Sequence, residues 1–493
     1  MVDRKWVTLS NTTIGTFMAL LDTSIVLVSL PTIGRELSGT NPALLLWVVL
    51  SYSVVTTTLL LSFGRLSDMF GRVRLYTLGF AVFTVGSLFA SLAPDGLVLL
   101  SARVVQGVGA GFLASNAAAI LTDAFPADER GRALGLNQVA ALTGSIVGLV
   151  LGGVLTTELG WRSIFWVNVP IGIFGTLWAY GQLVEVHPRE PSARVDWLGN
   201  VTFGLGLTLL LVGVTLGALD GWTQPIVLAG LSVGPALLVA FVVVERSAPQ
   251  PMFDLGLFRI RTFVAGNVAA ALSALAGGAF TFMMIFYFQG ILFLNAERAG
   301  ILLVPLAAAF AISGPISGTV SDRTGPRYLG TAGLLVSASG FALLIGFPVD
   351  GPYGLLALAM VLLGIGRGMF AAPNRAEVMS SVPPERRGIA AGTGMTFLNA
   401  GNLGSLALGF TVLAGVVPNG TLEAVFSGQP RGSALDVGGF MTALHLLFAI
   451  GLGLSLAAAG ANLLRGGGAV RARRGTRSRG TTPTVGAPPT GAK

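Results

Sequence analysis

Long stretches without a single charged residue constrain this chain more than any other feature of its sequence. A helix needs about 20 apolar residues to cross the hydrocarbon core of a membrane, and in lipid such a segment must satisfy its own backbone hydrogen bonds. Charge-free stretches of roughly this length or more cover residues 37–64, 75–94, 104–122, 133–157, 163–184, 197–219, 221–244, 262–296, 299–321, 328–349, 388–422 and 437–464. We therefore predict an all-α integral membrane protein.

Two further spans are predicted where an ionisable residue lies deep in an apolar segment. One span lies near residues 9–30 and contains Asp22, and the other lies near residues 354–376 and contains Arg367. The first of them has no small-residue cleavage site after its basic start, so we interpret it as a retained helix and not as a signal peptide. The chain is thus expected to have 14 transmembrane helices.

Residue types that carry much of metal and catalytic chemistry are scarce. The chain has no Cys, and its two His residues, His187 and His445, lie far apart in the sequence. Disulfide frameworks, thiolate metal sites and Cys nucleophiles are therefore excluded. We expect no metal site, no cofactor and no enzymatic activity. A membrane-embedded enzyme would need clustered His, Cys or acidic residues, and a sensor would need a soluble output domain; neither pattern is present.

The positive charge of the chain is unevenly distributed along the sequence. With 30 Lys and Arg against 22 Asp and Glu, the formal net charge is +8. If the N-terminus is cytoplasmic, 24 of the 30 bases fall in loops and tails on that side, as the positive-inside rule requires. The charge is therefore predicted to orient the helices in the bilayer and not to bind nucleic acid. We expect a multi-pass protein of a bacterial cytoplasmic (inner) membrane with both termini cytoplasmic.

An internal repeat relates the two ends of the chain. Gly107–Gly135 aligns without gaps on Gly364–Gly392 at an offset of 257, and GRLSDMFGRVRL from Gly64 matches GTVSDRTGPRYL from Gly318 at an offset of 254. Parallel six-helix halves of this kind are a transporter plan, with the substrate bound between the halves near the middle of the membrane. The predicted parts are an N-terminal six-helix bundle (1–184), two inserted linker helices with their loops (185–261), a C-terminal six-helix bundle (262–464) and a disordered basic cytoplasmic tail (465–493).

Four motifs occur in order along the chain. They are Leu21–Pro31, Gly64–Arg74, Arg103–Gly109 and Trp161–Gly172. Together with the number of spans, they resemble the major facilitator superfamily in its fourteen-span drug:proton antiporter branch. The resemblance implies a major-facilitator-type fold of two six-helix bundles plus two extra central helices. It also implies proton-coupled efflux of amphipathic, drug-like compounds by alternating access.

The same resemblance permits a second kind of cargo, namely an endogenous lipid, siderophore or metabolite. In both cases the expected partners are a small-molecule substrate, protons and the lipid bilayer. We expect the monomer to be the functional unit.

Asp22 and Arg103 form the leading candidate for proton coupling. A charged side chain inside a span costs at least about 2.5–3.5 kcal/mol to insert and usually serves a function. Asp22 lies about 12 Å, and Arg103 about 9 Å, from the same predicted membrane surface at 1.5 Å per residue. Burial disfavours a charged carboxylate and a nearby cation favours it, so opening and closing of the site can load and release a proton. The alternative is a fixed ion pair that joins spans 1 and 4.

A substrate cavity is predicted from polar and adaptable side chains within the spans. Gln106 lies three residues after Arg103 and shares its helix face. Met and aromatic side chains adapt to varied apolar ligands, although in a membrane protein many of them face lipid. Arg367 either favours anionic or zwitterionic groups in the cavity or pairs with Glu377 or another helix. The predicted cavity residues are Gln106, Phe280, Met283, Tyr287 and Arg367.

The loop at residues 64–74 is predicted to latch the cytoplasmic side. Glycine permits tight turns, and a carboxylate near a helix N-terminus gains about 0.3–1 kcal/mol. The alternative is that the arginines of this loop only fix the topology. Met69 departs from the basic residue that is usual at this position in the resembled family. The predicted latch residues are Gly64, Asp68, Gly71, Arg72, Asp322 and Arg323.

Glycines recur on one face of the fifth span. Gly144, Gly148 and Gly152 are four residues apart, and Gly153 lies beside them. Small residues at this spacing allow helices to approach closely in lipid, so we predict a helix-packing face. Leu149 stands where the antiporter signature of the resembled family has Pro.

Overall fold

The protein is helical throughout the part of the chain that its computed structural model describes. These residues are 4–126, 129–186, 195–248, 251, 253–383, 386–427 and 435–465. Within them, the only pairing of the β type is one isolated bridge between Ser38 and Asp95. The predicted tail beyond Arg465, His187 and the side chain of Asp322 lie outside the described part.

Fourteen of the described helical segments are long and apolar enough to cross a membrane, which confirms the predicted number of spans. The first six spans are built from α1 (Arg4–Glu36), α2 (Pro42–Phe70), α3 (Arg72–Ser91), α4 (Gly96–Ala124), α5 (Arg130–Leu159), and α6 (Ser163–Trp166) with α7 (Asn168–Gln182). We call these helices the first bundle.

Two helices follow, α8 (Trp197–Asp220) and α9 (Pro225–Ser247). The second bundle then comprises η1 (Leu255–Arg259), α10 (Arg261–Phe286) continued by the π-helical turn η2 (Tyr287–Ile291), α11 (Ala296–Leu302), α12 (Val304–Thr324), α13 (Pro326–Leu344), α14 (Tyr353–Ser380), α15 (Arg387–Val416), α16 (Asn419–Ser427) and α17 (Val437–Leu463).

Local sequence signals explain where several helices begin. Asn41 caps α2 by accepting a hydrogen bond from the Leu44 backbone N–H at 2.8 Å, and Pro42 occupies the first helical position. Proline fits there because the first turn needs no donor from it. Gly71 separates α2 from α3 with φ of 106°, and Gly325 separates α12 from α13 with φ of 88°. Side-chain-bearing residues rarely adopt this conformation, so glycine is required at equivalent places in both copies of the repeat.

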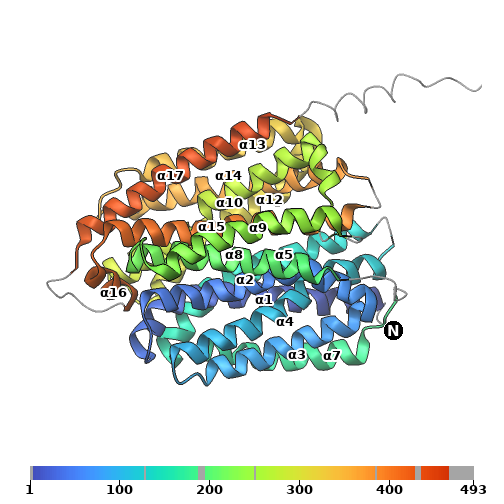
Figure 1. Cartoon of the computed structure of the whole chain (residues 1–493), viewed down its shortest axis with the longest axis horizontal. Helices are drawn as coiled ribbons and strands as arrows, with labels where there is room; N and C mark the ends of the chain where they lie inside the picture. The colour runs from blue at the N-terminus through green and yellow to red at the C-terminus, as the bar shows by residue number, and fades with distance from the viewer. Residues whose placement is uncertain are drawn as a thin grey trace, which may run out of the picture.

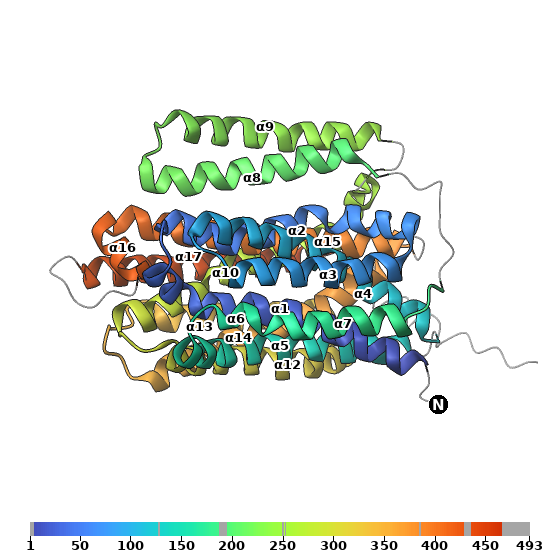
Figure 2. The same ribbon diagram turned by 90° about the horizontal axis from the view of Figure 1, so that it is seen from below.

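The two bundles lie side by side, and α8 and α9 form a separate layer over one face of the pair (Figures 1 and 2). Helix α8 packs against α2 of the first bundle and α15 of the second. Helix α9 packs mainly against α8, among the described helices. The extra pair therefore covers one side of the seam between the bundles.

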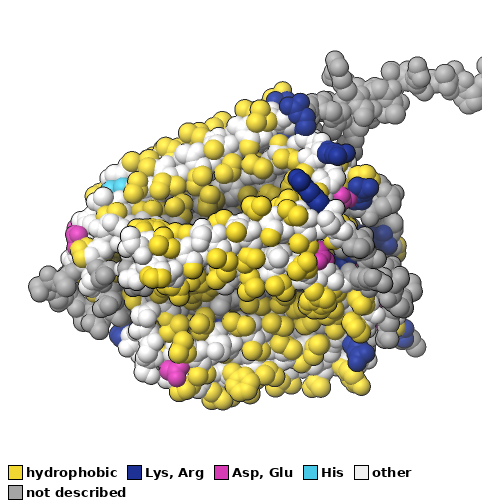
Figure 3. All heavy atoms as spheres, viewed as in Figure 1, with side chains coloured by type: hydrophobic (Ala, Val, Ile, Leu, Met, Phe, Trp, Pro, Cys, Tyr) yellow, Lys and Arg dark blue, Asp and Glu magenta, His cyan; other side chains and the backbone are white. Residues whose placement is uncertain are grey.

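The surface of the molecule is divided between an apolar flank and a basic end. On the face shown in Figure 3, hydrophobic side chains cover the middle, and Lys and Arg side chains gather at the end where α1 begins and α17 ends. We call this the terminal end and the other the opposite end. A broad apolar flank is what a helix bundle presents to lipid.

Contacts between the bundles are close at the opposite end. A Cβ atom built on Gly153 of α5 would lie 2.5 Å from the Ala296 carbonyl oxygen at the start of α11, and Gln289 Nε2 donates to the Val28 carbonyl oxygen at 2.7 Å. Near the terminal end, a Cβ atom on Gly135 of α5 or Gly318 of α12 would meet no atom within 4 Å. The bundles are therefore closed against each other at the opposite end, and nearer the termini α2 and α15 also meet, where a Cβ atom on Gly392 would collide with the Leu61 side chain.

Candidate functional site

Asp22 and Arg103 form a buried ion pair inside the first bundle. Arg103 Nη1 donates to Asp22 Oδ2 at 2.5 Å, and the two side chains are 1% and 0% exposed. Asp22 lies on α1 and Arg103 on α4, so the pair joins two helices that are separate in the sequence. The matching depths of these residues in their predicted spans had indicated this contact.

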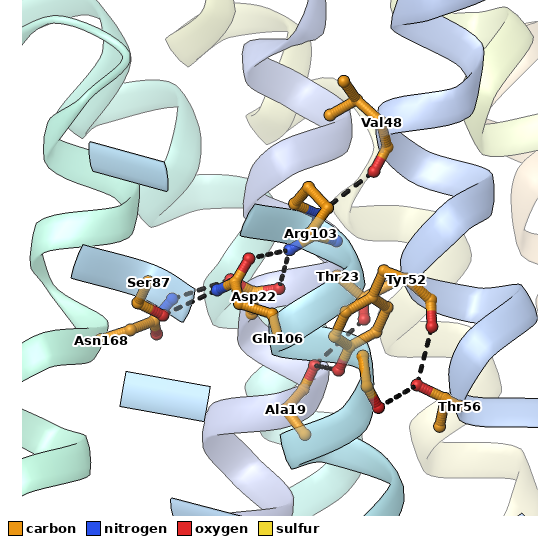
Figure 4. A network of polar contacts seen from close by, with 11 residues as sticks. Ala19, Asp22, Thr23, Val48, Tyr52, Thr56, Ser87, Arg103, Gln106 and Asn168 are labelled. Atoms are coloured by element: carbon orange, nitrogen blue, oxygen red, sulfur yellow. Dashed lines mark hydrogen bonds and ion pairs between the residues drawn. The ribbon is translucent and has the colours of Figure 1, made fainter. Parts of the chain in front are cut away.

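The second oxygen of Asp22 is held by two amide side chains (Figure 4). Asn168 Nδ2 of α7 donates to Asp22 Oδ1 at 2.8 Å, and Gln106 Nε2 of α4 donates to the same oxygen at 3.2 Å. Gln106 also donates to Ser87 Oγ of α3 at 2.7 Å. Since all these side chains are buried, the carboxylate is held in place by donors from several helices without contact with water.

Arg103 has further partners around its guanidinium group. Nη1 also donates to Gln106 Oε1 at 2.8 Å, and Nε donates to the Val48 carbonyl oxygen of α2 at 3.2 Å. The guanidinium lies over the Tyr52 ring, 4.4 Å from the ring centroid, where the face of the ring attracts a cation. The first bundle therefore contains one polar network that connects α1, α2, α3, α4 and α7.

The network has one free acceptor. Asn168 Oδ1 is buried, and no hydrogen-bond partner for it exists among the described residues. A carboxylate needs donors, whereas a protonated carboxyl group can itself donate. An amide rotated by half a turn presents its oxygen in place of its NH₂ group. Asn168 can thus serve both protonation states of Asp22.

The second bundle contains two small adjoining pockets. Both are lined by Ala276, Phe280 and Phe341. Arg367 of α14 lines the smaller pocket, and Met283 of α10 lines the larger one. Three of the five predicted cavity residues, Phe280, Met283 and Arg367, are therefore close together.

The other two predicted cavity residues lie elsewhere. Gln106 belongs to the buried network of the first bundle. Tyr287, in η2, donates its hydroxyl hydrogen to the Val349 carbonyl oxygen at 2.8 Å. Glu377, the sequence-based candidate partner of Arg367, instead forms an ion pair with Arg465.

The predicted latch residues pair within the first bundle in this conformation. Asp68 Oδ1 accepts hydrogen bonds from Arg72 Nε at 3.0 Å and Arg72 Nη2 at 2.8 Å, and Arg72 Nη1 contacts Asp123 Oδ2 of α4 at 2.8 Å. The carboxylate at the N-terminus of α3 belongs to Glu185 and not to Asp68. Glu185 accepts hydrogen bonds from the backbone N–H groups of Arg72 and Val73 at 3.0 and 3.1 Å.

The remaining latch residues make few contacts. Arg323 is exposed, and a Cβ atom on Gly64 would have no neighbour within 4 Å. Gly71 provides the left-handed turn between α2 and α3.

The glycines of α5 make close backbone contacts. A Cβ atom would lie 2.6 Å from the Phe17 carbonyl oxygen if built on Gly144, and 2.7 Å from the Leu21 carbonyl oxygen if built on Gly148. A Cβ atom on Gly152 would likewise contact α1, at Ile25. Gly153 instead faces α11 of the second bundle. Three glycines therefore hold α5 against α1 next to Asp22, and the fourth lies in the seam between the bundles.

We expect Gly148→Leu to destabilise the protein, because its side chain would collide with the α1 backbone. Overpacking of this kind costs about 1–3 kcal/mol. Gly135→Leu on the same helix is the matched control, since its Cβ atom has open space. The thermal unfolding midpoint in detergent should fall for Gly148→Leu and stay near the wild-type value for Gly135→Leu. Equal midpoints for the two variants would contradict the close packing of α5 on α1.

The sequence profile of the Major Facilitator Superfamily matches residues 12–406. The chain belongs to this superfamily. This chain is 36% identical over 429 residues to the cephamycin export protein CmcT of Amycolatopsis lactamdurans, with 86% of each chain covered. It is 34% identical over 417 residues to the multidrug resistance protein Stp of Mycobacterium tuberculosis, covering 83% of this chain and 75% of Stp.

A third relative of this chain is the riboflavin transporter RibZ of Clostridioides difficile. The identity is 33% over 391 residues, which are 78% of this chain and 83% of RibZ. The superfamily and these relatives are transporters, so the chain is a multi-pass membrane transporter and not an enzyme. The resemblance indicated by the four motifs is thereby confirmed.

Three contributors to these networks carried no role in the sequence-based prediction. Asn168 stands in the fourth motif as one amide in an apolar span, and Ser87 is one of many small polar residues in span 3. Glu185 follows span 6 and meets α3 only through the fold. An amide deep in a span was a usable signal for Asn168, because buried polar groups need partners. No comparable signal pointed to Ser87 or Glu185.

Proposed function

We propose that this transporter is a proton-coupled antiporter that exports amphipathic, drug-like compounds from the cytoplasm. The observation that carries the proposal is the buried Asp22–Arg103 pair, in which both charges are withdrawn from water inside the membrane-spanning region. Buried ionisable groups of membrane proteins commonly mark proton and substrate pathways. The relatives CmcT and Stp, named for cephamycin export and multidrug resistance, support the class of cargo.

In the proposed cycle, Asp22 carries the exchanged proton. The ionised carboxylate is held by Arg103, Gln106 and Asn168, as the structure has it. When Asp22 takes up a proton, its attraction to Arg103 weakens, and the rotated Asn168 amide accepts the new O–H hydrogen. Helices α1, α4 and α7 are then free to change their relative positions. Release of the proton restores the ion pair, so the protonation state is linked to helix packing.

We place both termini in the cytoplasm of a bacterial cell, because Lys and Arg gather at the terminal end, as the positive-inside rule predicts for the cytoplasmic side. With that orientation, the close contacts between α5 and α11 face the outside, and this conformation is closed to the exterior. Export requires those contacts to part. We further propose that the Asp68–Arg72–Asp123 network, with Arg323, holds the cytoplasmic side shut in the opposite state.

Dye transport in inverted membrane vesicles tests the function. Vesicles that contain the protein should accumulate ethidium when respiration acidifies their interior, and an uncoupler should release the dye. Vesicles from cells without the gene are the control. Accumulation that resists the uncoupler but requires ATP would exclude proton coupling, and a lack of accumulation for a panel of cationic, neutral and anionic dyes would exclude drug export.

A second candidate cargo is an endogenous metabolite. It is favoured by the similarity to RibZ, which is named as a riboflavin transporter. Growth of cells with and without the gene, in the presence of drugs, separates the two candidates. Drug export predicts a higher inhibitory concentration when the gene is present, whereas metabolite transport predicts no change.

A further inference from the structure

The second bundle has a pocket where the first bundle has its polar network. The network uses side chains of α1, α3, α4 and α7. The smaller pocket is lined mainly by α10, α13, α14 and α17, which occupy the same places in the second half of the repeat. At the repeat offset of 257, Gln106 corresponds to Leu363, and Leu363 lines the pocket. Where the first half has the carboxylate network, the described residues of the second half therefore bound a small space between helices.

Arg367 lies at this pocket without an opposite charge. Its guanidinium group lies against α10, since a Cβ atom on Gly277 would be 3.2 Å from Arg367 Cζ. Among the described residues, no hydrogen bond or ion pair involves the Arg367 side chain, and Glu377 is occupied by Arg465. A cation in a membrane-spanning helix without a partner is costly, and such residues usually face a pathway or a cavity.

A second polar group at the pocket is also unsatisfied. Ser337 of α13 is 3% exposed, and its hydroxyl group has no hydrogen-bond partner among the described residues. Leaving a buried polar group without a hydrogen-bond partner is unfavourable. Ser337 and Arg367 both line the smaller pocket, so one ligand that accepts hydrogen bonds can satisfy both.

The rest of the lining is suited to an apolar ligand. Phe280 and Phe341 belong to both pockets, and Met283 and Phe448 extend the wall of the larger one. The described lining residues of the two pockets include no Asp or Glu. A ligand with a negative charge at one end and an apolar body therefore matches the pockets better than a cation does.

We propose that the second bundle binds the carboxylate of an amphipathic compound, with Arg367 as its counter-charge and Ser337 as a further donor. The planar guanidinium group matches a carboxylate with two parallel hydrogen bonds. The apolar part of the ligand contacts Phe280 and Phe341. This inference rests on the proposed function only in treating the bound compound as cargo, and the binding site itself does not depend on proton coupling.

A matched pair of ligands tests the site. Dansylglycine and dansylglycine methyl ester share a fluorescent apolar body, and only the first carries a carboxylate. Titration of the purified full-length protein in detergent should give a Kd for dansylglycine that is lower by about tenfold or more. In Arg367→Met the preference should disappear through loss of dansylglycine affinity, while Arg367→Lys should retain part of it. Arg298→Met, which removes an exposed arginine, should leave the preference unchanged.

Thermal stability separates a ligand site from a structural role of Arg367. Because this arginine has no described partner to lose, Arg367→Met should unfold at the wild-type temperature or above it, whereas a structural arginine would lower the midpoint. Equal wild-type affinity for the two dansyl compounds, no binding of either, or an unchanged preference in Arg367→Met would overturn the proposal. Selective binding without export in vesicles would support the site and reject the compound as cargo. Ethidium export without selective binding would leave the proposed function standing and reject the site.

Discussion

Asp22→Asn is expected to reduce proton-driven dye export to the level of vesicles that lack the protein. An amide does not take up or release a proton near neutral pH, so the step that links protonation to helix packing is lost. The substitution also leaves Arg103 buried without its counter-charge, and breaking a buried ion pair costs about 3–5 kcal/mol. Export in inverted vesicles and the thermal midpoint of the purified protein should therefore both fall.

A double variant separates lost coupling from lost stability. Asp22→Asn combined with Arg103→Gln removes both charges, and removing a buried pair together costs much less than removing one partner. We expect the thermal midpoint to return toward the wild-type value and proton-driven export to remain absent. Glu158→Gln, which removes an exposed acid, is the control and should behave as the wild type. A stable double variant that still exports dye in response to the proton gradient would leave the pair only a structural role.

Gly153→Leu is expected to block the transport cycle without disrupting the first bundle. Its side chain would collide with α11 only when the bundles are closed at the opposite end. A penalty of about 1–3 kcal/mol on that state lowers its population by about 5- to 150-fold relative to the other state. Dye export should fall accordingly, while Gly181→Leu, whose Cβ atom has open space on α7, should transport normally.

Thiol labelling measures the shift directly, because the chain has no cysteine of its own. Ala296 is buried where α11 meets α5. In an Ala296→Cys background, a maleimide should react about fivefold faster or more when Gly153→Leu is present. An unchanged labelling rate together with unchanged export would show that the α5–α11 contact does not limit the cycle.

The fold was accessible from the sequence because lipid leaves a chain few choices. Each uncharged stretch must become a helix, and the paired turns at Gly71 and Gly325 repeat the same local requirement in both halves. Asp22 and Arg103 could be paired from depth alone, since a membrane fixes the height of each residue along its helix.

The composition of the networks was less accessible, because it depends on how the helices are rotated. Depth does not reveal which face of α7 carries Asn168 toward Asp22, nor that Glu185 reaches the start of α3. The predicted cavity residues were chosen by side-chain type, and the fold distributes them over separate places. Gln106 is used within the first bundle, whereas Arg367 faces a pocket in the second. The repeat could be used to relate these two regions only after the structure showed which helices lie next to one another.

The most direct test of the central claim is proton release on substrate binding. An exported dye is added at saturation to the purified protein in weakly buffered detergent solution, and a soluble pH indicator reports the protons released. We predict release by the wild type that rises with dye occupancy, and no release by the stable Asp22→Asn/Arg103→Gln variant. Equal release by the two proteins, or none by the wild type, would contradict the assignment of Asp22 as the proton carrier.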